Sequence, residues 1–404
     1  METKIALTVF VDVFLFLIAI GLLLPIAVLF LECSAAFFRS LRETSETAIP
    51  RPPVAILVPA HNEASGIGAT LSALLPQLKT QDRLIVIADN CTDETAQIAR
   101  SFGATAIERC DLDRLGKGYA LDYGLQFLEA DPPTVVIIVD ADCICQQDTI
   151  EQLVRVAVTS SQPVQAIYLM EKPPLPSPKD SISALAFTVK NLVRPSGLAQ
   201  LGFPCLLTGT GMAFPWSVIR EISLASGNIV EDMQLSVDLA IAGHSTIFCP
   251  EAKVIGCLPQ QQQAATSQRT RWEHGHLQTL LTQTPRLLKA AIAQRRFDLF
   301  AIALDLSVPP LSLLVAIWVT ALGGALLAAT LGASWLPATL LIIEGILILT
   351  SIVAAWAKFA RNDISALTLL AVPFYILWKI PLYLSFLVQR QTKWIRTERD
   401  AVDV

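Results

Sequence analysis

The sequence predicts an α/β fold in which a doubly wound, mostly parallel sheet is flanked by apolar helices that could cross a membrane. Between residues 54 and 142, short continuously apolar segments alternate with segments of helical periodicity, a pattern typical of parallel strands covered on both faces. Long apolar runs stand at both ends of the chain. Hydrophobic residues make up 53% of the 404 residues, above the usual share in soluble domains.

Length, charge and cysteine spacing narrow the classes of protein. A chain of 404 residues is longer than a domain with a single hydrophobic core usually is, so more than one structural unit is expected. The net charge of −5 gives no basic footprint, and no nucleic-acid partner is expected. None of the eight cysteines forms a CxxC pair, which argues against a zinc site. Seven lie in the middle of the chain, and we interpret them as reduced thiols facing the cytosol.

The N-terminal region, residues 1–35, is predicted to be a transmembrane helix. No charge interrupts Val13 to Leu31, which is about the length of a bilayer span. A secretory signal peptide is the alternative, but its apolar core is shorter, roughly 7–15 residues. Only Lys4 precedes the run, whereas three arginines follow it: Arg39, Arg42 and Arg51. The positive-inside rule then places the middle domain, residues 50–275, in the cytoplasm, as part of an integral protein of the plasma or inner membrane.

Residues 305–389 form a C-terminal transmembrane or re-entrant region with apolar runs at 306–331, 336–357 and 365–388. The pair Pro309-Pro310 predicts a break in the first run. Lys379 lies in the middle of the last run, where a charge is costly at bilayer depth. If all three runs cross, the basic tail 390–404 lies outside the cytoplasm, against the positive-inside rule. We therefore expect one run to be re-entrant or interfacial.

Residues 276–304 are predicted to form an amphipathic helix on the membrane surface, because leucines recur at near-helical spacing with arginine and lysine between them. An ordinary solvated helix of the middle domain is the alternative.

In the middle of the chain, the predicted strands alternate with predicted helices. Strands are expected at 54–60, 83–89, 104–109 and 134–142, and helices at 67–78, 93–103 and 116–130. Ligands of such sheets bind beyond the carboxyl ends of the strands. Polar side chains gather at those ends, including Glu63, Asp89, Asp140 and Asp142.

The segment VVIIVDADC, Val135 to Cys143, places two aspartates directly after an apolar strand. A plain strand edge would explain one acid. Alternate residues of a strand point to opposite faces, so Asp140 and Asp142 can reach one ligand only if the strand ends and the chain turns. Mg²⁺ and Mn²⁺ take oxygen ligands and bridge to phosphates. The segment therefore indicates a metal–diphosphate site.

Two glycine-containing segments are weaker evidence for a ligand site than the two aspartates. SGIGAT, residues 65–70, lacks the spacing of a dinucleotide-binding turn. In the GKG of residues 116–118, Lys117 precedes a helix and could face phosphate oxygens. A solvated loop lysine is the alternative.

The ordered set of motifs resembles the membrane-integrated family 2 glycosyltransferases, which include cellulose, hyaluronan and chitin synthases and ceramide glucosyltransferase. The motifs are VPAHNEA, ADNCTDETA, GKGYAL, VDAD, GTG at residues 209–211, VED at 230–232 and QRTRW at 268–272. They extend from Val54 to Trp272, and QxxRW follows the ED pair by about 36 residues. The resemblance implies the nucleotide-sugar-binding fold of inverting type A glycosyltransferases.

The resemblance also implies roles for individual residues. Asp89 would help to hold the nucleotide base, and Lys117 would lie near the nucleotide. Asp140 and Asp142, as the DxD motif, would bind the diphosphate through Mg²⁺ or Mn²⁺. Asp232 would be the general base, with a helix N-cap as the alternative. Gln268, Arg271 and Trp272 would hold the diphosphate and close over the acceptor. Val230 replaces the threonine frequent before ED, and Ala88-Asp89-Asn90 replaces Asp-Asp-Gly.

The chemistry agrees with these roles. Charge develops on the leaving diphosphate, which calls for a metal and a cation such as Arg271, and the acceptor hydroxyl needs one base. The expected partners are a nucleotide-sugar donor, with UDP-sugars foremost, a saccharide or lipid acceptor, and membrane lipids. A processive polysaccharide synthase and a single-sugar lipid glycosyltransferase both fit. A non-catalytic nucleotide sensor would lack the base or a metal ligand, and neither is missing. The oligomeric state is left open.

Overall fold

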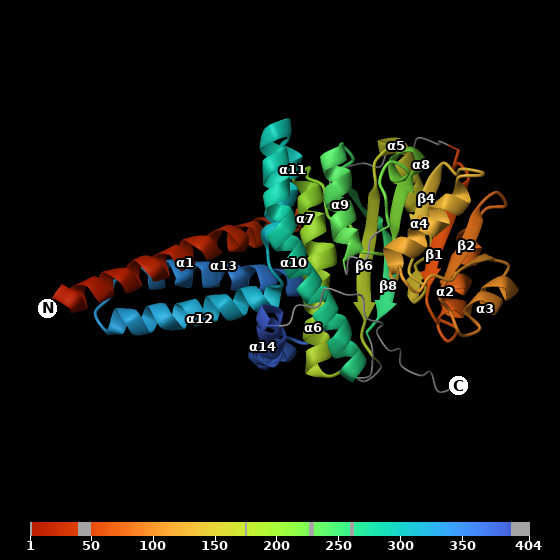
Figure 1. The fold of residues 1–404 in the computed structure, drawn as a ribbon. Coiled ribbons are helices and arrows are strands. Elements are labelled where there is room, and N and C mark those ends of the chain that lie inside the picture. The colour runs from red at the N-terminus through yellow and green to blue at the C-terminus, as the bar shows by residue number, and fades with distance from the viewer. Residues whose placement is uncertain (1, 39–49, 174–175, 226–229, 259–261, 389–404) are drawn as a thin grey trace.

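The computed structural model describes residues 2–38, 50–173, 176–225, 230–258 and 262–388. Its centre is an eight-stranded mixed sheet (Figure 1). The first half contains β1 (Val54–Ala60), β2 (Arg83–Asp89), β3 (Thr105–Arg109) and β4 (Val135–Ile138). These strands are parallel in the order β3-β2-β1-β4, which confirms the predicted fold class.

The second half of the sheet mixes directions. It contains β5 (Cys143–Cys145), β6 (Val164–Glu171), β7 (Met212–Pro215) and β8 (Ile247–Cys257). The complete order is β3-β2-β1-β4-β7-β6-β8-β5. Strand β7 is antiparallel to both β4 and β6, whereas β6 and β8 are parallel.

Helices cover both faces of the sheet because alternate residues of each central strand are apolar on both sides. Val54, Ile56 and Val58 of β1 share one core with α2 (Ile67–Leu74) and α5 (Thr149–Ser160). Ala55 and Leu57 share the other with α4 (Lys117–Leu128) and α9 (Glu231–Ala242). Each fully buried Ile or Leu contributes about 1.5–3 kcal/mol. Smaller elements complete this part: 3-10 helix η1 (Leu75–Gln77), α3 (Thr95–Ser101) and α8 (Trp216–Ile219).

Three apolar helices project side by side from the sheet domain (Figure 1): α1 (Glu2–Ala35), α12 (Leu311–Thr330) and α13 (Leu336–Phe359). Small residues at their contacts let them approach closely. A methyl group on Gly345 of α13 would lie 2.2 Å from the ring of Trp318 in α12. Four helices of the described chain are long and apolar enough to cross a membrane: these three and the stretch Ala366–Val388.

The last apolar stretch runs in another direction. It comprises η3 (Ala366–Ala371) and α14 (Val372–Val388), and Figure 1 shows α14 nearly end-on while α1, α12 and α13 run across the view. Lys379 of α14 is buried and forms an ion pair with Glu273, so its charge is not left alone in an apolar environment. An interfacial position of this stretch stays a prediction. The predicted basic tail 390–404 lies outside the described residues.

The helix predicted to begin at residue 276 begins earlier. Helix α10 spans Gln262–Gln294 without interruption and contains the QRTRW segment. It ends before Arg295, whose φ of 54° lies in the left-handed region, and α11 (Phe297–Ser307) follows. Leu287 of α10 packs against α9 and α11. Part of the apolar face expected on the membrane therefore belongs to a protein core. The predicted break at Pro309-Pro310 separates α11 from α12.

One continuous helical segment contacts both the sheet and the apolar helix α1. It consists of α6 (Pro178–Thr188), the π-helix η2 (Val189–Val193) and α7 (Arg194–Gln200). The buried guanidinium of Arg194 donates to Glu32 of α1 at 2.6 Å and to Asp305 of α11 at 2.5 Å. A Cβ atom on Gly197 would lie 1.9 Å from the carbonyl oxygen of Glu32. Only glycine permits this contact between α7 and α1.

Candidate active site

A cavity of about 340 Å³ begins at the carboxyl ends of β1, β2 and β4 and reaches the apolar helices. Its volume lies in the range of small-molecule sites. All nine site residues predicted from the sequence line it: Glu63, Asp89, Lys117, Asp140, Asp142, Asp232, Gln268, Arg271 and Trp272. The structure thus brings together residues separated by more than 200 positions, while their roles stay proposals.

The two aspartates after β4 lie on a turn. Strand β4 ends at Ile138 and β5 begins at Cys143, so Asp140 and Asp142 fall on the connection between them. This is the arrangement required for both carboxylates to approach one ligand. Ligand atoms of Asp140, Asp142 and Cys143 lie within 4.8 Å of one another. Burial raises the pKa of the Cys143 thiol well above its usual range, so the two carboxylates are the suitable ligands for a hard cation.

Lys117 connects the metal-binding candidates to the segment 209–211. Its ammonium forms an ion pair with Asp140 and donates to the carbonyl oxygen of Gly209 at 2.6 Å. The hydroxyl of Thr210 accepts the N–H of Asp140 at 3.0 Å. Gly209 has a φ of 93°, and a Cβ there would lie 3.3 Å from Oδ2 of Asp232. Glycine at 209 therefore lets Asp232 come close to the backbone. Lys117 lines the cavity at the start of α4 and is no solvated loop residue.

Asp232 is the second residue of α9 and is not its N-cap. Val230 occupies the N-cap, and no side chain caps the helix. The simple capping interpretation is therefore wrong, because α9 begins at Glu231 and its N-cap position falls on Val230, two residues before Asp232. Burial raises the pKa of Asp232, although Lys117 and Lys190 oppose this. Burial also raises the pKa of Glu231 to about 7, with a further contribution from Asp232.

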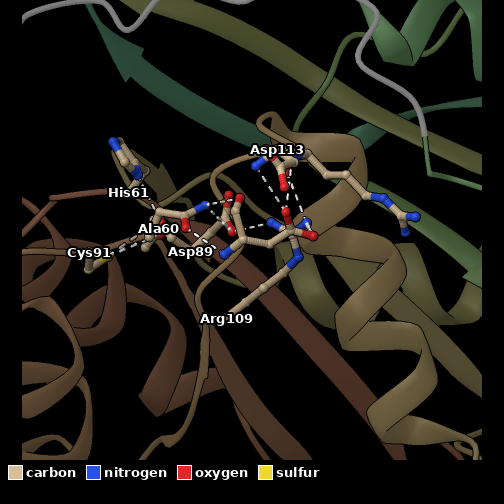
Figure 2. A network of polar contacts seen from close by, with 9 residues as sticks. Ala60, His61, Asp89, Cys91, Arg109 and Asp113 are labelled. Atoms are coloured by element: carbon tan, nitrogen blue, oxygen red, sulfur yellow. Dashed lines mark hydrogen bonds and ion pairs between the residues drawn. The ribbon is translucent and has the colours of Figure 1, made fainter.

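Asp89 is held by an arginine that the sequence analysis missed. Arg109, at the end of the neighbouring strand β3, forms a buried ion pair with Asp89 at 2.6 Å (Figure 2). Asn90 donates to Asp89 at 3.0 Å, and a ring nitrogen of His61 lies 2.6 Å from the Asp89 carbonyl oxygen. The in-register pairing of β2 with β3 places residues 89 and 109 opposite each other, so strand register was the signal that could have identified the partner.

The three residues of the QxxRW segment lie on α10 beside an aromatic group. Gln268 is buried, and Trp272 contacts Phe187 with ring centroids 5.8 Å apart. Phe187 in turn contacts Tyr168 edge-on at 5.1 Å. Trp272 thus packs against the core and lines the cavity. The Arg271 side chain forms no hydrogen bond or ion pair with the described part of the chain.

A model of the glycosyltransferase-like family 2 matches residues 50–275, more than half of the chain. The chain belongs to this family.

This family 2 glycosyltransferase is similar to several named proteins. It is 25% identical over 282 residues to a probable glycosyltransferase, YdaM, of Bacillus subtilis, covering 65% of this chain and 64% of that one. It is 32% identical over 138 residues to a 4,4'-diaponeurosporenoate glycosyltransferase of Staphylococcus aureus, covering 33% of this chain and 36% of that protein. The chain therefore spans less than two thirds of the length of either relative.

A solved structure supports the fold. A mannosyltransferase from Pyrobaculum calidifontis, in complex with GDP-Man and Mn²⁺, superposes with a TM-score of 0.55 at 18% identity. The match covers 87% of this chain and 100% of that chain. At this identity the similarity shows a shared fold.

Proposed function

We propose that this enzyme transfers a sugar from a nucleotide-sugar donor, with UDP-sugars the first candidates, to a saccharide or lipid acceptor at the membrane, with inversion. The observation that carries this proposal is the single cavity lined by Asp140, Asp142 and Asp232. The metal-binding candidates Asp140 and Asp142 lie on one turn, and Asp140 pairs with Lys117, whereas the carboxylate of Asp232 lies next to Gly209. Donor activation and proton removal would therefore use different carboxylates.

Asp232 is the proposed general base. The acceptor oxygen would form a bond to the anomeric carbon, the bond from that carbon to the diphosphate would break, and the hydroxyl proton would pass to Asp232. One base suffices for direct displacement, which inverts the anomeric carbon. Burial that raises the pKa of Asp232 makes it a stronger base than an exposed aspartate.

The leaving diphosphate is the proposed partner of the cationic and metal-binding groups. Asp140 and Asp142 would hold Mg²⁺ or Mn²⁺, which supplies positive charge to the diphosphate oxygens when bound. Arg271, without a partner in the described chain, and Gln268 would contact the same oxygens. The Lys117 ammonium adds a fixed positive charge. Burial alone lowers the pKa of Lys117, but Asp140 and its neighbours outweigh this and raise it, so the side chain stays protonated.

Glu63 and Asp89 are proposed to face the nucleotide. Both are buried, and both line the end of the cavity at β1 and β2. Trp272 would offer its ring to the sugar or acceptor. The membrane orientation, with residues 50–275 in the cytoplasm, rests on the arginines after α1. Residues 276–304 would lie at the membrane surface, and 305–389 would cross or enter it.

The test is incubation of the purified protein in nanodiscs with labelled nucleotide sugars and Mn²⁺ or Mg²⁺. Release of nucleoside diphosphate and a product of opposite anomeric configuration are expected. A polymer ladder would identify a processive synthase, and one lipid-soluble product would identify single transfer. Failure to release diphosphate from any donor in the panel would refute the proposal.

A further inference from the structure

Lys190 lies in the cavity at an unusual point of the backbone. It is the second residue of the π-helix η2, in which the N–H of Arg194 bonds to the carbonyl of Val189. Pro195 follows and has no N–H to continue a regular helical ladder. Single π-turns occur frequently at functional sites. Lys190 is exposed to the cavity that it lines.

The other cations of the cavity wall are mostly engaged. Four form ion pairs with carboxylates: Lys117 with Asp140, Arg194 with Glu32 and Asp305, Arg269 with Asp180, and Lys379 with Glu273. Within the described ranges, the side chains of Lys190 and Arg271 line the cavity and form no hydrogen bond or ion pair. Arg271 shares α10 with Gln268 and Trp272 and belongs to the proposed donor side. Lys190 stands on a different element.

Lys190 lines the same cavity as Asp232 and Glu273, and it lies near enough for both carboxylates to act on its charge. Although the Lys190 side chain is exposed to the cavity, the protein around the cavity desolvates its ammonium and lowers its pKa, and the negative charges of Asp232 and Glu273 oppose this change. Both carboxylates also line the cavity. Glu273 is already engaged with Lys379. Lys190 is therefore available to a ligand that approaches Asp232.

Another part of the cavity wall is apolar and comes from the apolar helices or from residues next to them. It is formed by Leu29 of α1, Val308 and Pro310 before α12, Leu311 of α12, and Tyr375 of α14. These elements continue into helices long enough to cross a membrane. The same cavity is therefore lined by the carboxyl ends of the strands, by the Lys190 ammonium and by apolar side chains near the helices that could cross a membrane.

We propose that Lys190 binds an anionic group, a phosphate or carboxylate, of a lipid acceptor whose apolar chain leaves the cavity between Leu29, Leu311 and Tyr375. The inference rests on the proposed function and names its acceptor class. A charged head beside Lys190 would place a neighbouring hydroxyl near Asp232, and the chain would remain in contact with the bilayer. Lys190 would act as a specificity residue.

The test uses the full chain in phosphatidylcholine nanodiscs with a photoreactive dodecyl phosphate that carries its diazirine at the chain end. Cross-linked peptides are expected to contain Leu29 or residues 308–311. Dodecyl phosphate or dodecanoate should compete about tenfold better than dodecanol, the ordinary effect of one charged contact. Whichever anion competes better identifies the phosphate or carboxylate source.

Three variants complete the design. K190Q should lose the preference for anions, K190R should keep it, and K289Q, at an exposed lysine of α10, should match the parent. Equal competition by dodecanol and the anions in the parent protein, or an unchanged preference in K190Q, would overturn the inference. Donor binding with Mn²⁺ is measured in the same samples. Its absence in the parent would instead refute the proposed function, and its presence in K190Q shows a folded protein.

Discussion

Replacing Asp232 with asparagine should separate donor binding from transfer. The substitution keeps the size of the side chain behind Gly209, whose hypothetical Cβ lies 3.3 Å from the Asp232 carboxylate. Lys117 remains held by Asp140 and by the Gly209 carbonyl at 2.6 Å, so the donor side is undisturbed. Removing a general base lowers a rate by about 10²–10⁴-fold, equivalent to about 3–5 kcal/mol of barrier.

The assay measures nucleoside diphosphate release at saturating donor, together with donor binding in the presence of Mn²⁺. Asp238→Asn is the matched control, because Asp238 lies on the same helix, bonds to Arg286 at 2.5 Å and does not line the cavity. D238N should transfer at nearly the parental rate. If D232N transfers at the parental rate, Asp232 is not the base. If D232N loses donor binding, Asp232 belongs to the donor site.

Three further predictions concern the metal, the ion pair at Asp89 and pH. Removing divalent metal with a chelator, or introducing Asp142→Asn, should reduce the transfer rate roughly 100-fold, which corresponds to about 3 kcal/mol of activation barrier. A Mn²⁺ titration of the transfer rate checks this prediction, and full activity in chelator would contradict it. Arg109→Leu leaves the Asp89 carboxylate buried without its partner and should lower the free energy of unfolding by about 3–5 kcal/mol. The control Arg100→Leu breaks the exposed ion pair with Glu108 and should lower it by less than about 1 kcal/mol. Equal effects of the two variants in denaturant unfolding would refute the burial argument. Burial raises the pKa of the proposed base Asp232 above the ordinary aspartate value, so Asp232 becomes protonated at a higher pH than an exposed aspartate. The transfer rate should therefore already fall on the acidic side at a pH above the ordinary aspartate range. A rate that stays constant down to about pH 4, the ordinary aspartate range, would show that Asp232 does not control the reaction.

The second half of the sheet could not be predicted from local patterns. Most residues of β6 are apolar, but its neighbours β7 and β8 come about 40 and 75 residues later and run in different directions. Gly211 shows why this depends on packing. Its φ is 64°, and a Cβ there would lie 2.8 Å from Val254 of β8. That contact exists only once three distant segments have come together.

The sequence by itself determined β1 to β4, the helices between them and the apolar helices at both ends. Such elements follow from local periodicity and uninterrupted apolar length. The sequence also identified nine of the residues that line the cavity, because their order along the chain resembles a family whose motifs mark strand ends and helix starts.

Only the tertiary structure decided which groups face one another. The pairing of Asp89 with Arg109 and the approach of Asp232 to Gly209 join segments that are distant in sequence. The position of Lys190 depends on the π-helix in which it lies. α14 was recognisable as an apolar run, yet only the folded chain shows its direction and the ion pair of its Lys379 with Glu273 in α10. Local patterns specify how a segment is shaped, whereas its partners depend on packing over the whole chain.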